Sequence, residues 1–108
     1  MNKRRPIKAR SLDALAAADV ARIDAIWREC LAQSGGPFLF GAFGATDAMY
    51  APVVSRLHTY AVEASPAARG YMRAMMALPA WHEWSEAARR EPWVLPHDEV
   101  DWPQVLRE

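Results

Sequence analysis

The segment from Asp13 to Gln33 contains neither glycine nor proline, and this constrains the fold of the chain more than any other feature. Its apolar residues recur at steps of three and four, which places them on one face of a helix. These residues are Val20, Ile23, Trp27, Cys30 and Leu31. Gly35-Gly36-Pro37 ends the pattern, because glycine suits the left-handed position after a helix and proline cannot continue one. The sequence predicts a helix over residues 13–34, with Ser11 as its N-cap.

A second helix is predicted from about Ala45 to Tyr60. Its apolar stripe is wide, which indicates that this helix is the most buried of the domain. The stripe consists of Met49, Val53, Leu57 and Tyr60, flanked by Tyr50, Val54 and Ala61. Pro52 lies about seven residues into this helix, and we expect it to bend the helix without breaking it.

Proline also marks the two helices that follow. Ser65-Pro66 predicts a helix start, since serine is a favoured N-cap and proline is favoured at the first helical position. The buried face of this third helix is formed by Ala68, Tyr71, Met72, Met75 and Leu78. Pro79 then starts a fourth helix and Pro92 ends it. Residues 93–108, with two further prolines, are expected to pack as an irregular tail.

The composition agrees with a helical protein. The chain of 108 residues has 21 alanines but only 12 residues of valine, isoleucine and threonine together. Alanine is the best helix former, and β-branched residues are typical of strands. The length suits one domain. We therefore expect residues 1–108 to form a single all-α domain, a bundle of four or five helices.

The charge and cysteine content exclude several classes of protein. The 13 basic and 13 acidic residues cancel, which gives no general reason to bind nucleic acid. No apolar run is long enough to cross a membrane, and a single cysteine cannot form a disulfide within the chain. Residues 1–11 are basic and are expected to be a poorly ordered lead-in. With no export signal in the sequence, we expect a cytoplasmic protein.

A search for chemical sites finds no catalytic, cofactor-binding or metal-binding constellation. His82-Glu83 lacks the second histidine of a zinc-protease motif, and the spacing of His58, His82 and His97 does not suit a metal. Cys30 lies on the apolar face of the first helix, where no cation lowers its pKa. A carboxylate cluster for acid–base chemistry is confined to the tail, at Asp98, Glu99 and Asp101.

The most specific stretch of the chain runs from Gly35 to Val54. It is an aromatic loop, which should pack on the rest of the protein, followed by a helix start. If Gly44 is the N-cap, then Asp47 falls at the third helical position. A carboxylate there can accept a hydrogen bond from the N–H of residue 44, and it complements the positive end of the helix.

This stretch resembles the C-terminal helical domain of cytosolic glutathione S-transferases, especially bacterial ones. In that family a segment of the form FLFG-x-F-S-x-A-D precedes the central buried helix, and its Ser and Asp form a capping box. The matching residues are Phe38, Leu39, Phe40, Gly41, Phe43 and Asp47, followed by Ala48 to Val54. Further similar segments are 19–27, 77–81, 83–84 and 91–94, so the resemblance covers nearly the whole chain.

Two departures from the family affect what the resemblance implies. Gly44 stands where the family has the capping Ser, so only the Asp47 half of the capping box can form. Gly44 and Asp47 are carried over only as a structural helix N-cap. The family's N-terminal thioredoxin-like domain and the first long helix of the helical domain have no counterpart here. Because the thioredoxin-like domain holds the group that activates the glutathione thiol, no catalytic residue is carried over.

The resemblance implies a transferase domain that helps to form the hydrophobic pocket for an electrophile and is inactive alone. Glutathione would be a co-substrate only if the N-terminal domain is supplied. The partner would be that thioredoxin-like domain, or a second copy bound through the uncovered apolar face; no nucleic acid or membrane is expected. The alternatives are a non-enzymatic helical protein–protein interaction module and a truncated remnant.

Overall fold

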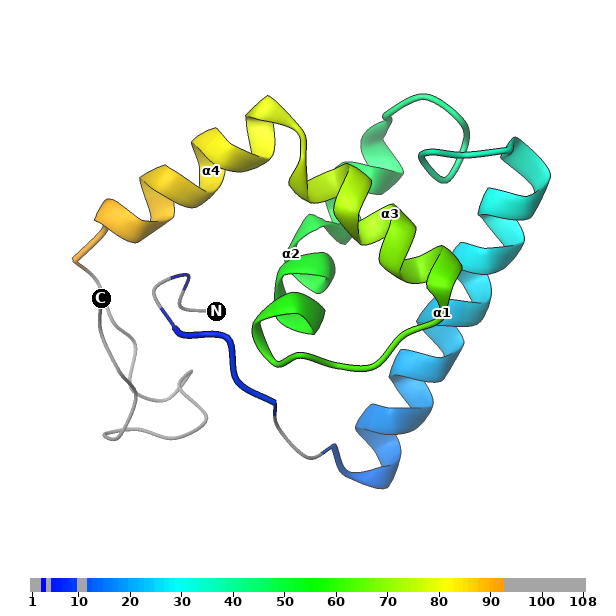
Figure 1. The fold of residues 1–108 in the computed structure, drawn as a ribbon, viewed down its shortest axis with the longest axis horizontal. Helices are drawn as coiled ribbons and strands as arrows, with labels where there is room; N and C mark the ends of the chain where they lie inside the picture. The colour runs from blue at the N-terminus through cyan, green and yellow to red at the C-terminus, as the bar shows by residue number, and fades with distance from the viewer. Residues whose placement is uncertain (1–2, 4, 10–11, 93–108) are drawn as a thin grey trace.

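A computed structural model describes residues 3, 5–9 and 12–92 of the chain. Within these residues the protein is all-α, as predicted (Figure 1). The four helices are α1 (Ala14–Ser34), α2 (Ala45–Thr59), α3 (Pro66–Met76) and α4 (Pro79–Arg90). The α1–α2 loop contains two isolated β-bridges, Phe38–Gly41 and Phe40–Ala42, and the described residues form no β-strand. The predicted irregular tail, residues 93–108, lies outside the described residues.

The boundaries of α1 follow from its two caps. The side chain of Asp13 accepts a hydrogen bond from the N–H of Ala16 at 2.8 Å. Asp13 is therefore the N-cap, and the prediction of Ser11 was wrong because an equally good capping residue lies closer to the first helical turn. At the other end Gly35 has φ +82°, a conformation that glycine adopts without strain, and its N–H donates to the carbonyl of Leu31 at 2.9 Å.

Helix α2 is continuous through Pro52, so the prediction that this proline does not break the helix is confirmed. Its expected bend stays a prediction. The predicted apolar stripe was partly wrong, because Met49 is 80% exposed. The buried positions of α2 are Asp47, Val54, Ser55, Leu57 and Thr59. Three of these five residues are polar. A prediction based on hydrophobicity alone therefore missed them and included an exposed residue instead.

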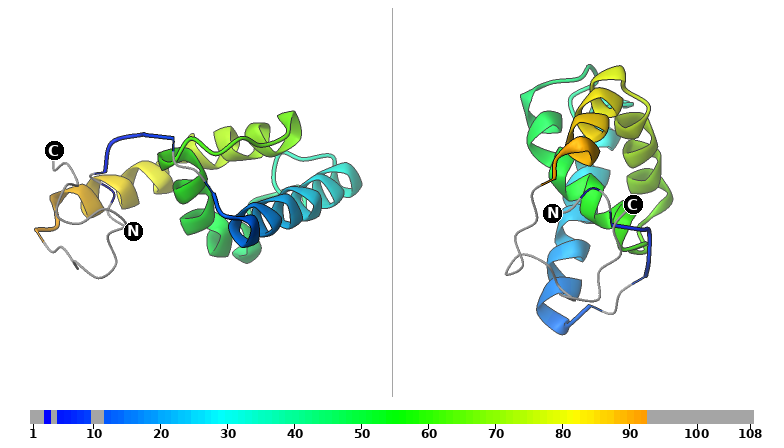
Figure 2. Two further views of the ribbon diagram at one scale, coloured as in Figure 1. Left: turned by 90° about the horizontal axis from the view of Figure 1, so that it is seen from below. Right: turned by 90° about the vertical axis from the view of Figure 1, so that its left-hand side faces the viewer.

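Helix α3 is the centre of the arrangement. Within the described part, its backbone closely approaches those of α1, α2 and α4, whereas the other helix pairs do not come as close to one another. Figures 1 and 2 show α3 next to both α1 and α2, and in the left view of Figure 2 α1 and α2 lie on the same side of α3. Helix α4 extends away from this body, and its starting end adjoins the end of α3. No described helix is long and apolar enough to cross a membrane.

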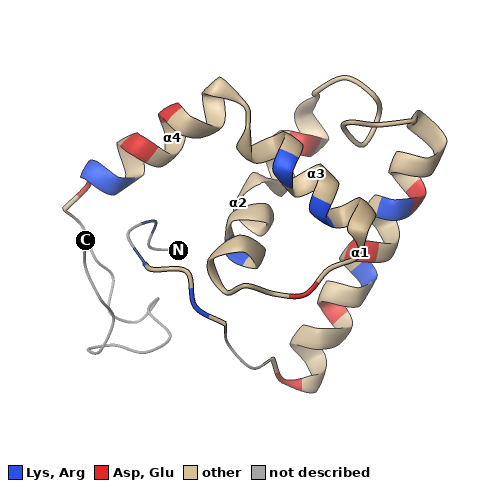
Figure 3. Cartoon of the chain, viewed as in Figure 1, with Lys and Arg blue, Asp and Glu red and all other residues tan. Residues whose placement is uncertain are grey.

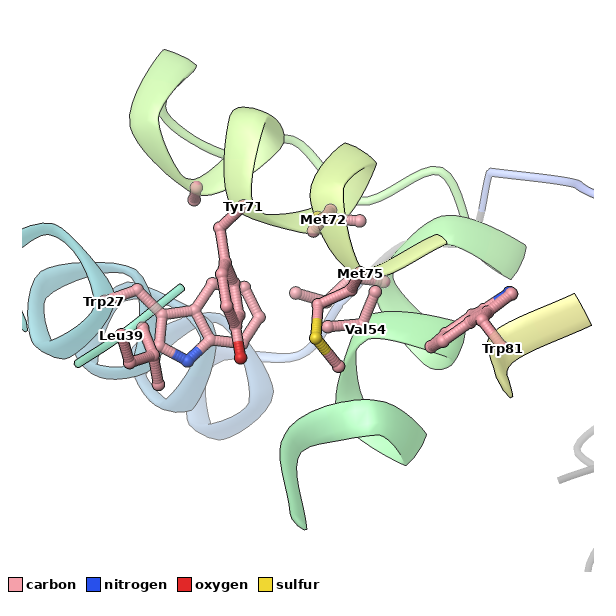
Figure 4. Close-up of a cluster of buried hydrophobic side chains, with 9 residues drawn as sticks. Trp27, Leu39, Val54, Tyr71, Met72, Met75 and Trp81 are labelled. Carbon is pink, nitrogen blue, oxygen red and sulfur yellow. The ribbon is translucent and has the colours of Figure 1, made fainter. Parts of the chain in front are cut away.

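The core fills the space between α1, α2 and α3 (Figure 4). Its centre is aromatic: the rings of Trp27 and Tyr71 are 4.8 Å apart, and Tyr50 packs edge-on against Trp27 at 5.4 Å. Edge contacts of this kind add to the free energy gained by burial. The fully or nearly buried apolar residues are Trp27, Leu39, Val54, Leu57, Ala68, Tyr71, Met72, Met75 and Trp81.

The described part of the N-terminal segment, residues 3 and 5–9, lies beside α2 and α4 (Figures 1 and 2). The backbone N–H of Lys8 donates to the carbonyl of Thr59 at 2.8 Å. Lys3 contacts both α2 and α4. The expectation that residues 1–11 are poorly ordered stays a prediction.

The carboxylate of Asp24 joins α1 to the start of α3. Asp24 accepts from the N–H of Ser65 at 2.8 Å and from its hydroxyl at 2.7 Å, while Arg28 donates to the same carboxylate at 3.0 Å. Burial alone would raise the pKa of Asp24. The hydrogen bonds from Ser65, followed by those from Arg28 and its charge, outweigh this effect and hold the pKa below its usual value.

We predict that Asp24→Ala lowers the free energy of unfolding at pH 7 by about 1–3 kcal/mol, because it removes hydrogen bonds to a charged group. The folded-state pKa of Asp24 lies below the unfolded value of about 3.9, so its contribution is complete above that value and is lost as the pH falls through the folded pKa. Urea unfolding of the two proteins between about pH 7 and pH 3 should show the difference shrinking in acid. Asp19→Ala, an exposed change on the same helix, is the control. A difference that does not vary with pH contradicts the assignment.

Candidate functional site

The carboxylate of Asp47 is completely buried and connects three parts of the protein. Its Oδ2 accepts from the N–H of Gly44 at 2.9 Å. Its Oδ1 accepts from the hydroxyl of Tyr71 at 2.8 Å and from the N–H of Leu39 at 3.3 Å. The aromatic loop, the start of α2 and the middle of α3 are therefore held by one side chain.

The local sequence explains why Asp47 can take this position. Gly44 is the N-cap of α2, with extended backbone dihedrals of −145° and −177°. Gly44 has no side chain that could accept a hydrogen bond from the first turn of α2. Of the two hydrogen bonds of a capping box, only the one from the Gly44 N–H to Asp47 is therefore present. The carboxylate at the third position also lies at the positive end of the helix.

The hydroxyl of Tyr71 is a fixed donor in this network. Burial, and then the hydrogen bond to Asp47 and its charge, raise the pKa of Tyr71 well above its usual value. The phenol therefore stays protonated. Sequence reasoning placed Tyr71 on the buried face of its helix but missed this role. The available signal was that a buried tyrosine needs a partner for its hydroxyl.

The aromatic loop packs on the core less completely than predicted. Leu39 is 1% exposed, and Phe38 is half-buried against the core. Phe40, in contrast, is 69% exposed, and Phe43 is 48% exposed although its ring meets that of Phe38 at 5.6 Å. The loop turns tightly, with Phe38 and Gly41 exchanging backbone hydrogen bonds at 3.2 and 3.0 Å, and the turn directs Phe40 to solvent.

An apolar groove lies where the start of α2, the end of α3 and the start of α4 meet. Its volume is about 360 Å³. Every residue that lines it is apolar: Phe43, Ala48, Ala51, Pro52, Met75, Leu78, Ala80, Trp81 and Trp84. Phe43 and Trp84, which are 48% and 40% exposed, contribute aromatic surface to its lining. The whole α1–α2 loop that borders it carries no charged side chain before Asp47 (Figure 3).

The comparison with protein families gives one match. The family described as Glutathione S-transferase, C-terminal domain matches residues 9–87. This chain belongs to that family. The match confirms the resemblance found in the sequence and takes up most of the 108 residues, which leaves no room within them for a thioredoxin-like domain. Neither the curated proteins nor the solved structures gave a match.

Within this glutathione S-transferase C-terminal domain, the residues that the sequence singled out do not come together as a reactive site. Over the described residues, no group of three or more histidine, cysteine or acidic side chains could hold a metal ion. His58 and His82 are exposed on different helices, and Cys30 is half-buried on α1. His97, Asp98, Glu99 and Asp101 lie outside the described residues. The groove was not predicted, because its walls come from three helices whose relative positions the sequence does not specify.

We predict that Asp47→Ala lowers the free energy of unfolding by about 3–5 kcal/mol, since two backbone N–H groups and a buried hydroxyl lose their acceptor. Tyr71→Phe removes a single bond to the same carboxylate and should cost about 1–2 kcal/mol. Urea unfolding followed by circular dichroism measures both. Tyr50→Phe, a half-buried tyrosine with no such bond, should change little. If Tyr71→Phe is as neutral as this control, the Tyr71–Asp47 bond does not stabilise the fold.

We further predict that Gly44→Ser raises the free energy of unfolding by roughly a few tenths of a kcal/mol, because a serine completes the capping box. The position has open space for a side chain, and its φ is extended. Gly41→Ser is the matched control and should destabilise the protein, since Gly41 has φ +94°. Urea midpoints that fall for both variants would argue against a cap at residue 44.

Proposed function

We propose that this chain acts as the helical half of a glutathione S-transferase-type protein and that the apolar groove forms part of its pocket for hydrophobic electrophiles. The observation that carries this proposal is the groove itself, a hollow of about 360 Å³ lined by apolar residues, in a chain of this family. Binding sites for small molecules are typically concave and lined by apolar and aromatic side chains.

The aromatic residues suit this role. Phe43 and the pair formed by Trp81 and Trp84, whose rings are 5.3 Å apart and nearly perpendicular, offer both faces and edges to a planar ligand. Flat apolar electrophiles such as halogenated nitroaromatics would stack on these rings. The adjustable side chain of Met75 lies in the same wall and can accommodate ligands of differing shape.

The proposed reaction is attack of the glutathione thiolate on an electrophilic carbon, which forms a sulfur–carbon bond and releases the leaving group with its electron pair. A thioredoxin-like domain, supplied as a partner, would hold glutathione and lower the pKa of its thiol. Glutathione is then a co-substrate, and the expected location is the cytoplasm. Alone, this chain would orient the electrophile but would not activate the thiol.

A second candidate, a non-enzymatic interaction module, is favoured by the apolar side chains outside the groove. Phe40, in the α1–α2 loop, and Met49, on α2, are 69% and 80% exposed. Exposed apolar surface of this kind is typical of sites where proteins associate.

We predict that the purified chain binds a fluorescent naphthalene sulfonate dye in the groove, but does not accelerate the conjugation of glutathione to a chloronitrobenzene. Phe43→Ala removes one aromatic wall and should weaken dye binding about three- to tenfold. Fluorescence titration measures the affinity, and the absorbance of the thioether product measures conjugation.

Phe40→Ala is the matched control, because it removes the same side chain from the same loop outside the groove. If the two variants bind the dye equally well, the groove is not the site. Conjugation by the chain alone that a glutathione analogue inhibits would refute the proposal that a second domain is needed.

A further inference from the structure

The ammonium group of Lys3 contacts two helices, α2 and α4. Its Nζ donates to the hydroxyl oxygen of Ser55, on α2, at 2.8 Å. It also lies over both tryptophan rings of α4, 4.9 Å from the ring centre of Trp81 and 4.8 Å from that of Trp84. Both distances are within the range of attractive cation–π interactions.

The two tryptophans are arranged so that one cation can meet both. They are three residues apart on α4 and so lie on the same side of the helix. Their ring planes are 81° apart. Trp81 is 9% exposed and belongs to the core, which fixes the position of one of the two rings.

The environment of Lys3 shows that its ammonium is partly withdrawn from water. Burial, and then the positive charge of Arg89, lower the pKa of Lys3. The side chain of Arg89 is paired with Glu86 at 3.3 Å, which offsets part of this repulsion. A cation–π interaction becomes stronger as the cation loses its water, so the same burial strengthens the contact with the rings.

Within the described residues, α4 makes few close backbone contacts with other helices. Among the described helices its backbone closely approaches only α3. Figures 1 and 2 show the described part of the N-terminal segment beside both α4 and α2. That segment is itself fixed to α2 by the bond from the Lys8 N–H to Thr59 and by Arg5, whose guanidinium lies 5.7 Å from the ring centre of Tyr60.

We propose that Trp81, Trp84 and Ser55 form an ammonium-binding site, that Lys3 of the same chain is its ligand, and that the filled site is the latch that holds α4 against α2. Lys3, in the basic N-terminal segment, then stabilises the position of α4. Trp81 and Trp84 also line the apolar groove, but the latch concerns the position of α4 and requires no bound substrate.

The test is amide hydrogen exchange of residues 84–90 in the full 108-residue chain. Lys3→Met keeps an apolar stem and removes the charge, and it should make these amides exchange about three- to tenfold faster, with little change in α1. Lys3→Arg, which keeps a cation, should retain most of the protection. Lys8→Met is the matched control in the same segment, because the Lys8 side chain is exposed and only its backbone takes part.

A second pair of variants separates the latch from a general effect on stability. In a Trp84→Leu background, where one ring is missing, adding Lys3→Met should change the exchange of α4 by less than twofold, since the interaction is already weakened. The proposal is overturned if Lys3→Met exchanges like wild type or like Lys8→Met. It is also overturned if its effect is undiminished in the Trp84→Leu background.

Discussion

The buried carboxylate of Asp47 is the interaction on which the rest of this structure depends. A charge with no solvent exposure is costly unless its oxygens are fully hydrogen-bonded, and here three donors from three different segments converge on it. Removing any one of those segments leaves the carboxylate undersatisfied. The loop, α2 and α3 can therefore reach low free energy only together. This makes a polar side chain at a helix start the element that specifies how an otherwise apolar core is assembled.

Carboxylates and hydroxyls recur at the other helix starts. Asp13 caps α1, and Ser65 caps α3 while also bonding to Asp24 of α1. Helix α4 differs, because its N-cap is Leu78 and no side chain bonds to its first turn. Its position depends instead on the ring of Trp81 in the core and on the basic segment near residue 3. The polar caps thus fix the body, and aromatic contacts attach the last helix to it.

Much of the fold could be predicted from the sequence, because glycine, proline and serine mark helix ends through local backbone chemistry. The starts at Ala45, Pro66 and Pro79 follow from such signals. What escaped prediction depends on contacts between distant residues. Polar side chains of α2 are buried while Met49 is in solvent, because distant residues pack on them: Tyr71 bonds to Asp47 and Lys3 bonds to Ser55. The bond between Asp47 and Tyr71 spans 24 residues, and the contact of Lys3 with Ser55 spans 52. No periodicity within one helix contains that information.

The central place of α3 has a consequence for how the chain reaches its structure. Helices α1 and α2 meet mainly through long side chains such as Trp27 and Tyr50, and each closes its apolar face chiefly against α3. Residues 66–76, however, come after both of them in the sequence. During synthesis, the first two helices leave the ribosome before the element that covers them. Until α3 emerges, the apolar faces of α1 and α2 are exposed and available to a chaperone that binds apolar surface. A ribosome stalled at this stage would carry a chain that cannot yet fold.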